Sequence, residues 1–158
     1  MKIGFASDIH RLVEGRELIL AGVIVPFEKG ELAHSDGDVV YHALAESLLG
    51  ALALGDLGTH FPDSDPKYKN INSALLVEAV MKMVFEKGFE VGNVDISITL
   101  EQPKLKPFIK DMRQNIAELL HANIDCVSVK AGTNEGMGEI GSGEAVKAES
   151  IVLLKEKE

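Results

Sequence analysis

The sequence predicts one α+β domain over residues 1–158, in which a mixed β-sheet packs against helices. Its length supports a single domain, because 158 residues lie close to the ~100–150 residues that domains most often contain. Strand-like segments with alternating apolar residues occur beside helix-like segments with an apolar residue every three or four positions. No internal repeat, low-complexity segment or linker separates them, so we expect them to share one core.

The N-terminal part of the chain predicts strands and then a helix. Residues 2–13 have the pattern of one strand that ends in polar residues, and residues 18–25 that of two short strands around a tight turn. A polar, glycine-bearing loop is expected over residues 28–37. From Asp38 to Leu52 the apolar residues recur at helical spacing, which predicts the first helix.

The middle of the chain predicts a loop between two helices. Ser35 and Asp36 stand where their side chains could cap the first helix. Residues 55–70 hold glycines, prolines and aspartates, so we expect no regular structure there. A second helix is expected to begin near Ser73 and to end before Gly88.

The C-terminal half predicts strands on either side of a third helix. Residues 94–101 alternate between apolar and polar, as a half-buried strand does. Pro107 opens a helical pattern, since proline suits the first turn of a helix. Residues 127–131 and 146–154 have strand patterns with a glycine-rich turn between them. Because only a turn separates these last two strands, part of the sheet is expected to be antiparallel.

Charge and hydropathy exclude several classes of partner. The 25 acidic residues outnumber the 16 Lys and Arg residues and give a net charge of −9, which repels a nucleic-acid backbone. The longest nearly apolar run, residues 48–55, is far shorter than the ~20 residues of a membrane helix, so no membrane partner is expected. The first residues show no targeting signal, and the single cysteine, Cys126, fits a reducing compartment, so we expect a cytoplasmic protein.

Asp8 and His10 lie at the end of the first expected strand. Residues two apart in a strand point to the same face, so a carboxylate and an imidazole project together. Both groups are common zinc ligands. The competing interpretation is an exposed Asp and His at a strand end, and the D-x-H pattern alone favours it.

A second polar cluster, H-S-D-G-D at residues 34–38, leads into the first helix. Asp38 and His42 are four residues apart and therefore share one helix face. The start of a helix also attracts anions such as phosphate. Taken alone, the two aspartates could merely stabilise the helix dipole, and His42 could be an ordinary hydrogen-bonded histidine of the core. Together with Asp8 and His10, however, the cluster predicts a metal site.

Two glycine-bearing segments are further candidates. Residues 55–65 have the glycines, proline and carboxylates of many substrate loops, although composition alone favours a solvated connection. Residues 130–141 contain a formal G-x-G-x-x-G, but the segment behind it alternates like a strand, which excludes a dinucleotide-binding motif. What remains is a turn rich in N–H, hydroxyl and carboxylate groups, suited to phosphate and a hard metal ion.

The motifs also occur in one order along nearly the whole chain. They are Asp8-x-His10, the 34–38 block with His42, Gly55-Asp56-Leu57-Gly58 with Phe61-Pro62-Asp63, Gly92-Asn93-Val94-Asp95, Pro103-Lys104, and Lys130-Ala131 with Thr133 and Glu135. In this order they resemble the 2-C-methyl-D-erythritol 2,4-cyclodiphosphate synthase family of the non-mevalonate isoprenoid pathway. The resemblance implies an α+β fold and a homotrimer whose active sites are shared between neighbouring subunits.

The resemblance also implies two metal ions. One Zn²⁺ per subunit would be held by Asp8, His10 and His42. A Mg²⁺ or Mn²⁺ ion would be held partly by Glu135 and partly by the substrate diphosphate. The two aspartates of the 34–38 block would then support the zinc ligands or cap the helix. His34 and Thr133 would be the catalytic residues that stabilise charge on the reacting phosphates.

The implied substrate is a cytidine diphosphate, 4-diphosphocytidyl-2-C-methyl-D-erythritol 2-phosphate. Its 2-phosphate would attack the β-phosphorus, giving the cyclic diphosphate and CMP. The residues implied to contact it are Ser35, Asp56, Leu57, Gly58, Phe61, Pro62, Asp63, Ser64, Asp65, Leu100, Glu101, Gln102, Pro103, Lys104, Leu105, Lys106, Ala131, Gly132 and Asn134. Among them, residues 100–106 would form the cytosine pocket, Asp56 and Gly58 would meet the sugar, and residues 61–65 the erythritol side.

Some positions depart from the family pattern. Gly132 and Asn134 stand where hydroxyl residues are frequent, so two phosphate contacts would come from the backbone alone. Ser7, Glu139 and Ser142 depart from the pattern near the implied trimer axis, where some relatives bind isoprenoid diphosphates. An acidic side chain and no arginine predict weak or no such binding here.

Two other functions remain open at this point. A zinc-dependent phosphoesterase could use the same Asp/His/His set to activate water, and it would release inorganic phosphate. A non-catalytic metal-binding trimer would lose metal, but no turnover, when His42 is replaced by Ala.

Overall fold

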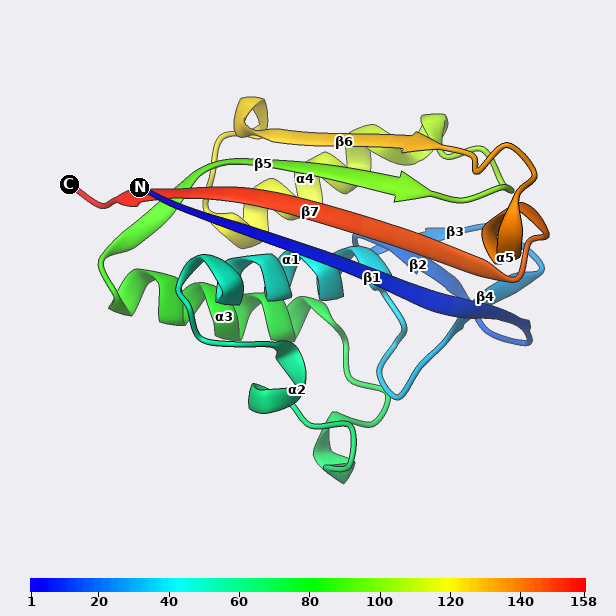
Figure 1. Cartoon of the computed structure of the whole chain (residues 1–158), viewed down its shortest axis with the longest axis horizontal. Helices are drawn as coiled ribbons and strands as arrows, with labels where there is room; N and C mark the ends of the chain where they lie inside the picture. The colour runs from blue at the N-terminus through cyan, green and yellow to red at the C-terminus, as the bar shows by residue number, and fades with distance from the viewer.

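Three long helices cover one face of a five-stranded sheet in the computed structural model, which describes residues 1–158 (Figure 1). Single 3₁₀ turns occur at Pro66–Tyr68, Lys106–Phe108 and Ile124–Cys126. The strands and α-helices are β1 (Lys2–Glu14), β2 (Leu18–Leu20), β3 (Val23–Val25), β4 (Lys29–Leu32), α1 (Val39–Ala51), α2 (Leu57–His60), α3 (Ala74–Glu86), β5 (Phe89–Thr99), α4 (Ile109–Leu120), β6 (Val127–Gly132), α5 (Gly138–Gly141) and β7 (Ala145–Glu156).

The sheet is mixed, with the strand order β4-β1-β7-β5-β6, and β2 and β3 form a separate hairpin. The predicted α+β fold is therefore confirmed, but the expected reason for antiparallel pairing was wrong. The last two strands, β6 and β7, are not neighbours: β6 pairs in parallel with β5, and β7 lies antiparallel between β1 and β5. The inner face of β7 is entirely apolar or small, which suits a central strand, whereas β6 ends in exposed residues at the sheet edge.

Close packing of α1 on the sheet brings two parts of the candidate site together. Gly4 of β1 makes this approach possible, since a Cβ atom there would lie 1.8 Å from the carbonyl oxygen of Ser47 and 2.6 Å from the amide nitrogen of Ala51. Most of α1 is buried in the core. As a result, the first turns of α1 lie beside the second half of β1.

Several expected loops contain short regular elements. The 28–37 loop contains β4, which pairs with the end of β1. The 55–70 loop contains α2, whose first turn is capped because the Asp56 carboxylate accepts from the Thr59 N–H. The glycine-rich turn before β7 contains α5. In each case four residues or fewer are involved, too few for a periodic pattern to be visible in the sequence.

The expected element boundaries also need three corrections. The strand predicted over residues 94–101 begins earlier, at Phe89, because β5 continues past a bulge to pair with the end of β7. The third helix begins at Ile109, after a 3₁₀ turn at the predicted proline. The first helix is capped by Asp38, whose side chain accepts from the Tyr41 N–H, and not by Ser35 or Asp36.

The face of the sheet that the helices leave open carries apolar side chains. Ile3, Phe5 and Ile9 of β1 and Ile151 of β7 are all exposed there. Phe5 lies directly opposite Ile151 in the β1–β7 ladder, so Ile3, Phe5 and Ile151 form one apolar patch, whereas Ser7 and Glu149 separate Ile9 from it. None of the helices is both long and apolar enough to cross a membrane.

Candidate active site

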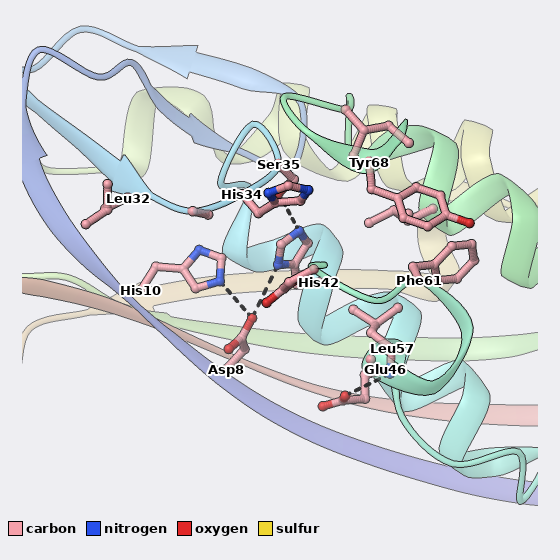
Figure 2. Close-up of a pocket in the computed structure, with 15 residues that line it drawn as sticks. Asp8, His10, Leu32, His34, Ser35, His42, Glu46, Leu57, Phe61 and Tyr68 are labelled. Carbon is pink, nitrogen blue, oxygen red and sulfur yellow. Dashed lines mark hydrogen bonds and ion pairs between the residues drawn. The ribbon is translucent and has the colours of Figure 1, made fainter. Parts of the chain in front are cut away.

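Asp8, His10 and His42 converge at the junction of β1 and α1, with one potential ligand atom of each within 4.8 Å of the others. Asp8 and His10 come from the same face of β1, and His42 comes from the first turns of α1. The Asp8 Oδ2 atom lies 3.0 Å from His10 Nε2 and 3.5 Å from His42 Nδ1. Figure 2 shows both imidazole rings turned toward the Asp8 carboxylate. The metal cluster predicted from the sequence is therefore brought together.

The donor atoms fit a tetrahedral metal ion. With bonds of about 2 Å to zinc, ligand atoms are about 3.3 Å apart, close to the spacings within this cluster. The other nitrogen of each ring is occupied: His10 Nδ1 lies 2.7 Å from the Gly37 carbonyl oxygen, and His42 Nε2 lies 3.0 Å from the hydroxyls of Ser35 and Ser73. These contacts leave His10 Nε2 and His42 Nδ1 as the free nitrogens beside Asp8.

The Asp8 carboxylate and the neighbouring His10 ring each favour the charged form of the other. Burial raises the pKa of Asp8, but hydrogen bonds and charge from His10 and His42 outweigh it and hold that pKa well below its ordinary value. Burial lowers the pKa of His10, but the Asp8 carboxylate and the Gly37 carbonyl outweigh it and raise that pKa above 6.5. The raised pKa of His10 means that protonation of its ring competes with metal binding.

Two buried acidic side chains, Asp38 and Glu31, hold the start of α1 in place. Asp38 accepts hydrogen bonds from the N–H groups of Ala21, Gly22 and Tyr41, and burial nevertheless raises its pKa to about 6. Glu31, which the sequence analysis missed, accepts from the N–H groups of Ile19 and Val39 at 3.0 Å each. Burial, with Asp38 nearby, raises the pKa of Glu31 to about 10.

A cavity of about 380 Å³ opens beside the metal cluster (Figure 2). It brings together six further residues that were predicted to form the site: His34, Ser35, Leu57, Gly58, Phe61 and Asp63. Six lining residues were not predicted, and no spacing rule marks them: Leu32, Ala33, Glu46, Tyr68, Ile71 and Leu76. Glu46 has a visible role, since its carboxylate accepts from the Leu57 N–H at 3.2 Å and so fixes α2 to α1.

Four residues predicted in the same loop do not line this cavity. The Asp56 carboxylate is engaged by the Thr59 hydroxyl at 2.7 Å, which lowers the pKa of Asp56. Asp65 accepts at its carbonyl oxygen from the His34 ring at 3.2 Å. Pro62 and Ser64 lie in the same loop between α2 and the 3₁₀ turn at Pro66–Tyr68.

A second cavity, of about 270 Å³, lies at the other edge of the sheet, beside β5 and β6. Its predicted residues are Leu100, Glu101, Pro103, Lys104, Leu105, Lys106, Ala131, Gly132 and Thr133, and Ile109 completes it. Gln102, Asn134 and Glu135 do not line it. The Glu101 carboxylate accepts from the N–H groups of Asn134 and Gly136, which ties the turn to this cavity.

The two cavities share no lining residue. The structure therefore does not bring Thr133 and Glu135 to the metal cluster within one chain. Both residues are exposed on the turn after β6, and the Glu135 N–H donates to the Thr133 hydroxyl oxygen at 3.2 Å.

Known proteins resemble this chain along nearly its whole length. A sequence model described as the YgbB family matches residues 1–155. A curated Geobacter metallireducens protein, 2-C-methyl-D-erythritol 2,4-cyclodiphosphate synthase, is 52% identical over 157 residues, covering 99% of this chain and 100% of that protein. A Clostridium perfringens protein of the same name is 51% identical over 154 residues, covering 98% and 99%.

Solved structures agree with the sequence relatives. A bifunctional IspDF protein from Campylobacter jejuni matches with a TM-score of 0.94 at 43% identity, and the match covers 98% of this chain but 42% of that longer one. A Plasmodium falciparum IspF solved as a CDP complex matches with a TM-score of 0.87 at 34% identity, covering 99% of this chain and 97% of that one. The chain therefore belongs to the YgbB family, whose curated members are named 2-C-methyl-D-erythritol 2,4-cyclodiphosphate synthase.

Proposed function

We propose that this chain is a cyclodiphosphate synthase, a phosphorus–oxygen lyase of isoprenoid precursor biosynthesis. It converts 4-diphosphocytidyl-2-C-methyl-D-erythritol 2-phosphate into 2-C-methyl-D-erythritol 2,4-cyclodiphosphate and CMP. One observation carries the proposal: the Asp8–His10–His42 cluster opens into a cavity with His34 and the α2 loop, in a chain half identical to full-length synthases.

The reaction needs little acid–base chemistry from the protein. The 2-phosphate of the substrate is already ionised at neutral pH, so it is a nucleophile without a strong general base. The main barrier is the approach of two anionic phosphates in line, which positioned donors and charges lower. When bound, Zn²⁺ at the cluster and Mg²⁺ or Mn²⁺ at Glu135 would offset the negative charge of the phosphates.

Two side chains are placed to assist the phosphates directly. His34 lies in the wall of the metal cavity, where its contact with the Asp65 carbonyl fixes the orientation of the ring. The Thr133 oxygen accepts from the Glu135 N–H, so its own proton stays available to a phosphate oxygen. We assign both residues to stabilising charge in the transition state.

The second cavity suits the cytidine end of the substrate. It combines backbone groups of residues 100–106 with the apolar side chains of Leu105 and Ile109, a mixture suited to a planar polar base. The Plasmodium falciparum relative was solved with CDP, which supports a cytidine nucleotide as the ligand of this chain.

A complete active site needs both cavities, which lie at opposite sheet edges of one chain. We propose a homotrimer in which the metal cavity of one subunit meets the β6 turn and cytidine cavity of its neighbour. The exposed apolar patch formed by Ile3, Phe5 and Ile151 supports assembly, because exposed apolar patches commonly mark interfaces. The cytoplasm stays the expected compartment.

Phosphorus NMR tests the activity. The zinc-loaded protein is incubated with the substrate and Mg²⁺, and His42→Ala is the control. We expect equal amounts of CMP and cyclic diphosphate from the wild type and neither from the variant. Release of inorganic phosphate would instead indicate a phosphoesterase, and metal binding with no product would indicate a non-catalytic metal-binding trimer.

A further inference from the structure

We propose that Ser73, at the start of α3, is a positioning residue for the metal site. Its hydroxyl links the carboxylate of Asp36 to the ring of His42 and, together with the Ser35 hydroxyl that contacts the same Nε2 atom, keeps Nδ1 of His42 facing the metal. The proposal rests on the proposed function only in requiring that a metal ion binds at His42.

The geometry fixes the direction of each hydrogen bond. Ser73 is fully buried, and its hydroxyl donates to Asp36 Oδ1 at 2.5 Å. A serine hydroxyl has one proton, so toward His42 Nε2, 3.0 Å away, the Ser73 oxygen acts as an acceptor. His42 must then carry its proton on Nε2. Its Nδ1 lone pair is left free, and this is the atom that lies 3.5 Å from the Asp8 carboxylate.

The Ser73 hydroxyl does not cap the helix that it precedes. A serine at the start of a helix usually accepts from a free N–H of the first turn, but Ser73 makes no such bond. The neighbouring Asn72 does so instead, with its side-chain oxygen accepting from the Ala74 N–H at 2.9 Å. The hydroxyl therefore contacts only Asp36 and His42, which points to the metal site and not to the helix.

Asp36 joins the segments that surround the cavity. Its carboxylate accepts from the N–H groups of Asp38, ahead of α1, and Ser73, ahead of α3. Its own N–H donates to the carbonyl of Ile71 at 3.0 Å. Replacing Ser73 by alanine leaves these backbone bonds in place and removes only the hydroxyl. The substitution thus separates the positioning of His42 from the anchoring of the loop.

Zinc affinity of the purified protein, measured by competition with a chromophoric chelator, tests the proposal. We expect Ser73→Ala to weaken zinc binding by about 10–100-fold, the usual effect of losing a partner of a metal-binding histidine. The matched control is Ser47→Ala. Ser47 is also a fully buried serine, but its hydroxyl bonds to Leu44 and Ser150 in the core, so its loss should change zinc affinity less than about twofold.

Two further measurements distinguish a role of Ser73 in positioning His42 from a general loss of packing around the site. The absorption spectrum of the Co²⁺-substituted protein should change in Ser73→Ala and stay unchanged in Ser47→Ala. Asp36→Asn should weaken zinc binding at least as much as Ser73→Ala, because it disturbs the acceptor of the Ser73 hydroxyl and also the backbone bonds that anchor the loop. If Ser73→Ala does not fold, Asp36→Asn and its cobalt spectrum carry the test alone.

The proposal is overturned if Ser73→Ala keeps wild-type zinc affinity and cobalt spectrum, if Ser47→Ala loses as much affinity, or, where Ser73→Ala does not fold, if Asp36→Asn keeps both. Its failure is distinct from failure of the proposed function. If only the Ser73 proposal fails, the wild type still releases CMP from the substrate. If only the proposed function fails, zinc affinity responds to Ser73 as expected, but the wild type makes no cyclic product.

Discussion

The metal cavity and the β6 turn are held in opposite ways. In the cavity, the ligands rest on buried groups: Asp38 and Glu31 fix the start of α1, and backbone or hydroxyl oxygens fix each imidazole. On the turn, Thr133 and Glu135 are exposed, and the Glu101 carboxylate is the side chain from outside the turn that bonds to it. The chain thus holds the metal cluster on buried groups of its own and leaves the β6 turn on its surface, which is the arrangement expected if a neighbouring subunit completes the site.

The largest expected effect is in the metal half. Asp8→Ala removes the carboxylate that bridges both histidines, so bound zinc should be lost. We expect CMP release to fall by about 10³-fold or more, because a metal centre supplies several kcal/mol of charge stabilisation. Metal analysis and CMP release measure both effects. Asp125→Asn, at an exposed aspartate away from both cavities, is the control and should match the wild type.

The next largest expected difference between the metal cavity and the β6 turn is in their contribution to the free energy of unfolding. Asp38→Ala leaves three N–H groups at a buried site without their acceptor, so the free energy of unfolding should fall by about 3 kcal/mol or more. Glu101→Ala frees two N–H groups that water can reach, and should cost less than about 1 kcal/mol. Urea unfolding of both variants measures the difference. Equal losses would mean that the two regions are not held differently.

Thr133→Ala should affect activity without affecting stability or metal content. The side chain is exposed, so the free energy of unfolding should stay within about 0.5 kcal/mol of the wild type. Loss of a donor to transition-state charge should lower kcat by about 10²–10³-fold. Thermal unfolding, zinc analysis and steady-state kinetics are the measurements. A fall in zinc content would contradict the separation of the two regions.

The smallest expected effect is on pH dependence. The raised pKa of His10 means that this ring is protonated near pH 6 in the metal-free protein, while Asp8 stays ionised. Zinc affinity should therefore fall as the pH decreases below the His10 pKa, by about tenfold per pH unit for one displaced proton. Chelator competition between pH 8 and pH 6 measures this. An affinity that does not change over this range would contradict the proposed ligand protonation.

Local patterns predicted much of the fold. The long strands and the three long helices follow from periodicity. Spacing also predicted a metal site among Asp8, His10 and the polar block before the first helix, and the family resemblance then selected Asp8, His10 and His42. These predictions depend on residues close in sequence, where strand and helix geometry alone decide which side chains share a face.

The remainder depends on contacts between distant segments. The insertion of β7 between β1 and β5 pairs it with residues more than a hundred positions away in β1 and 48 to 67 positions away in β5, and no local pattern in β7 specifies these neighbours. Ser73 and Asp36 are 37 positions apart and meet only because α3 packs on α1. Glu31 is one of three acidic residues in the polar segment 28–37, and only the folded chain shows that it is buried and hydrogen-bonded.

The most direct test of a shared active site is complementation between two inactive variants. Asp8→Ala subunits keep an intact β6 turn, and Thr133→Ala subunits keep an intact metal cavity. If each site takes its cavity from one subunit and its turn from the next, co-expression in equal amounts should restore about a quarter of wild-type CMP release, since half of the subunits supply each intact part. Co-expressed protein no more active than the average of the two variants would contradict the account.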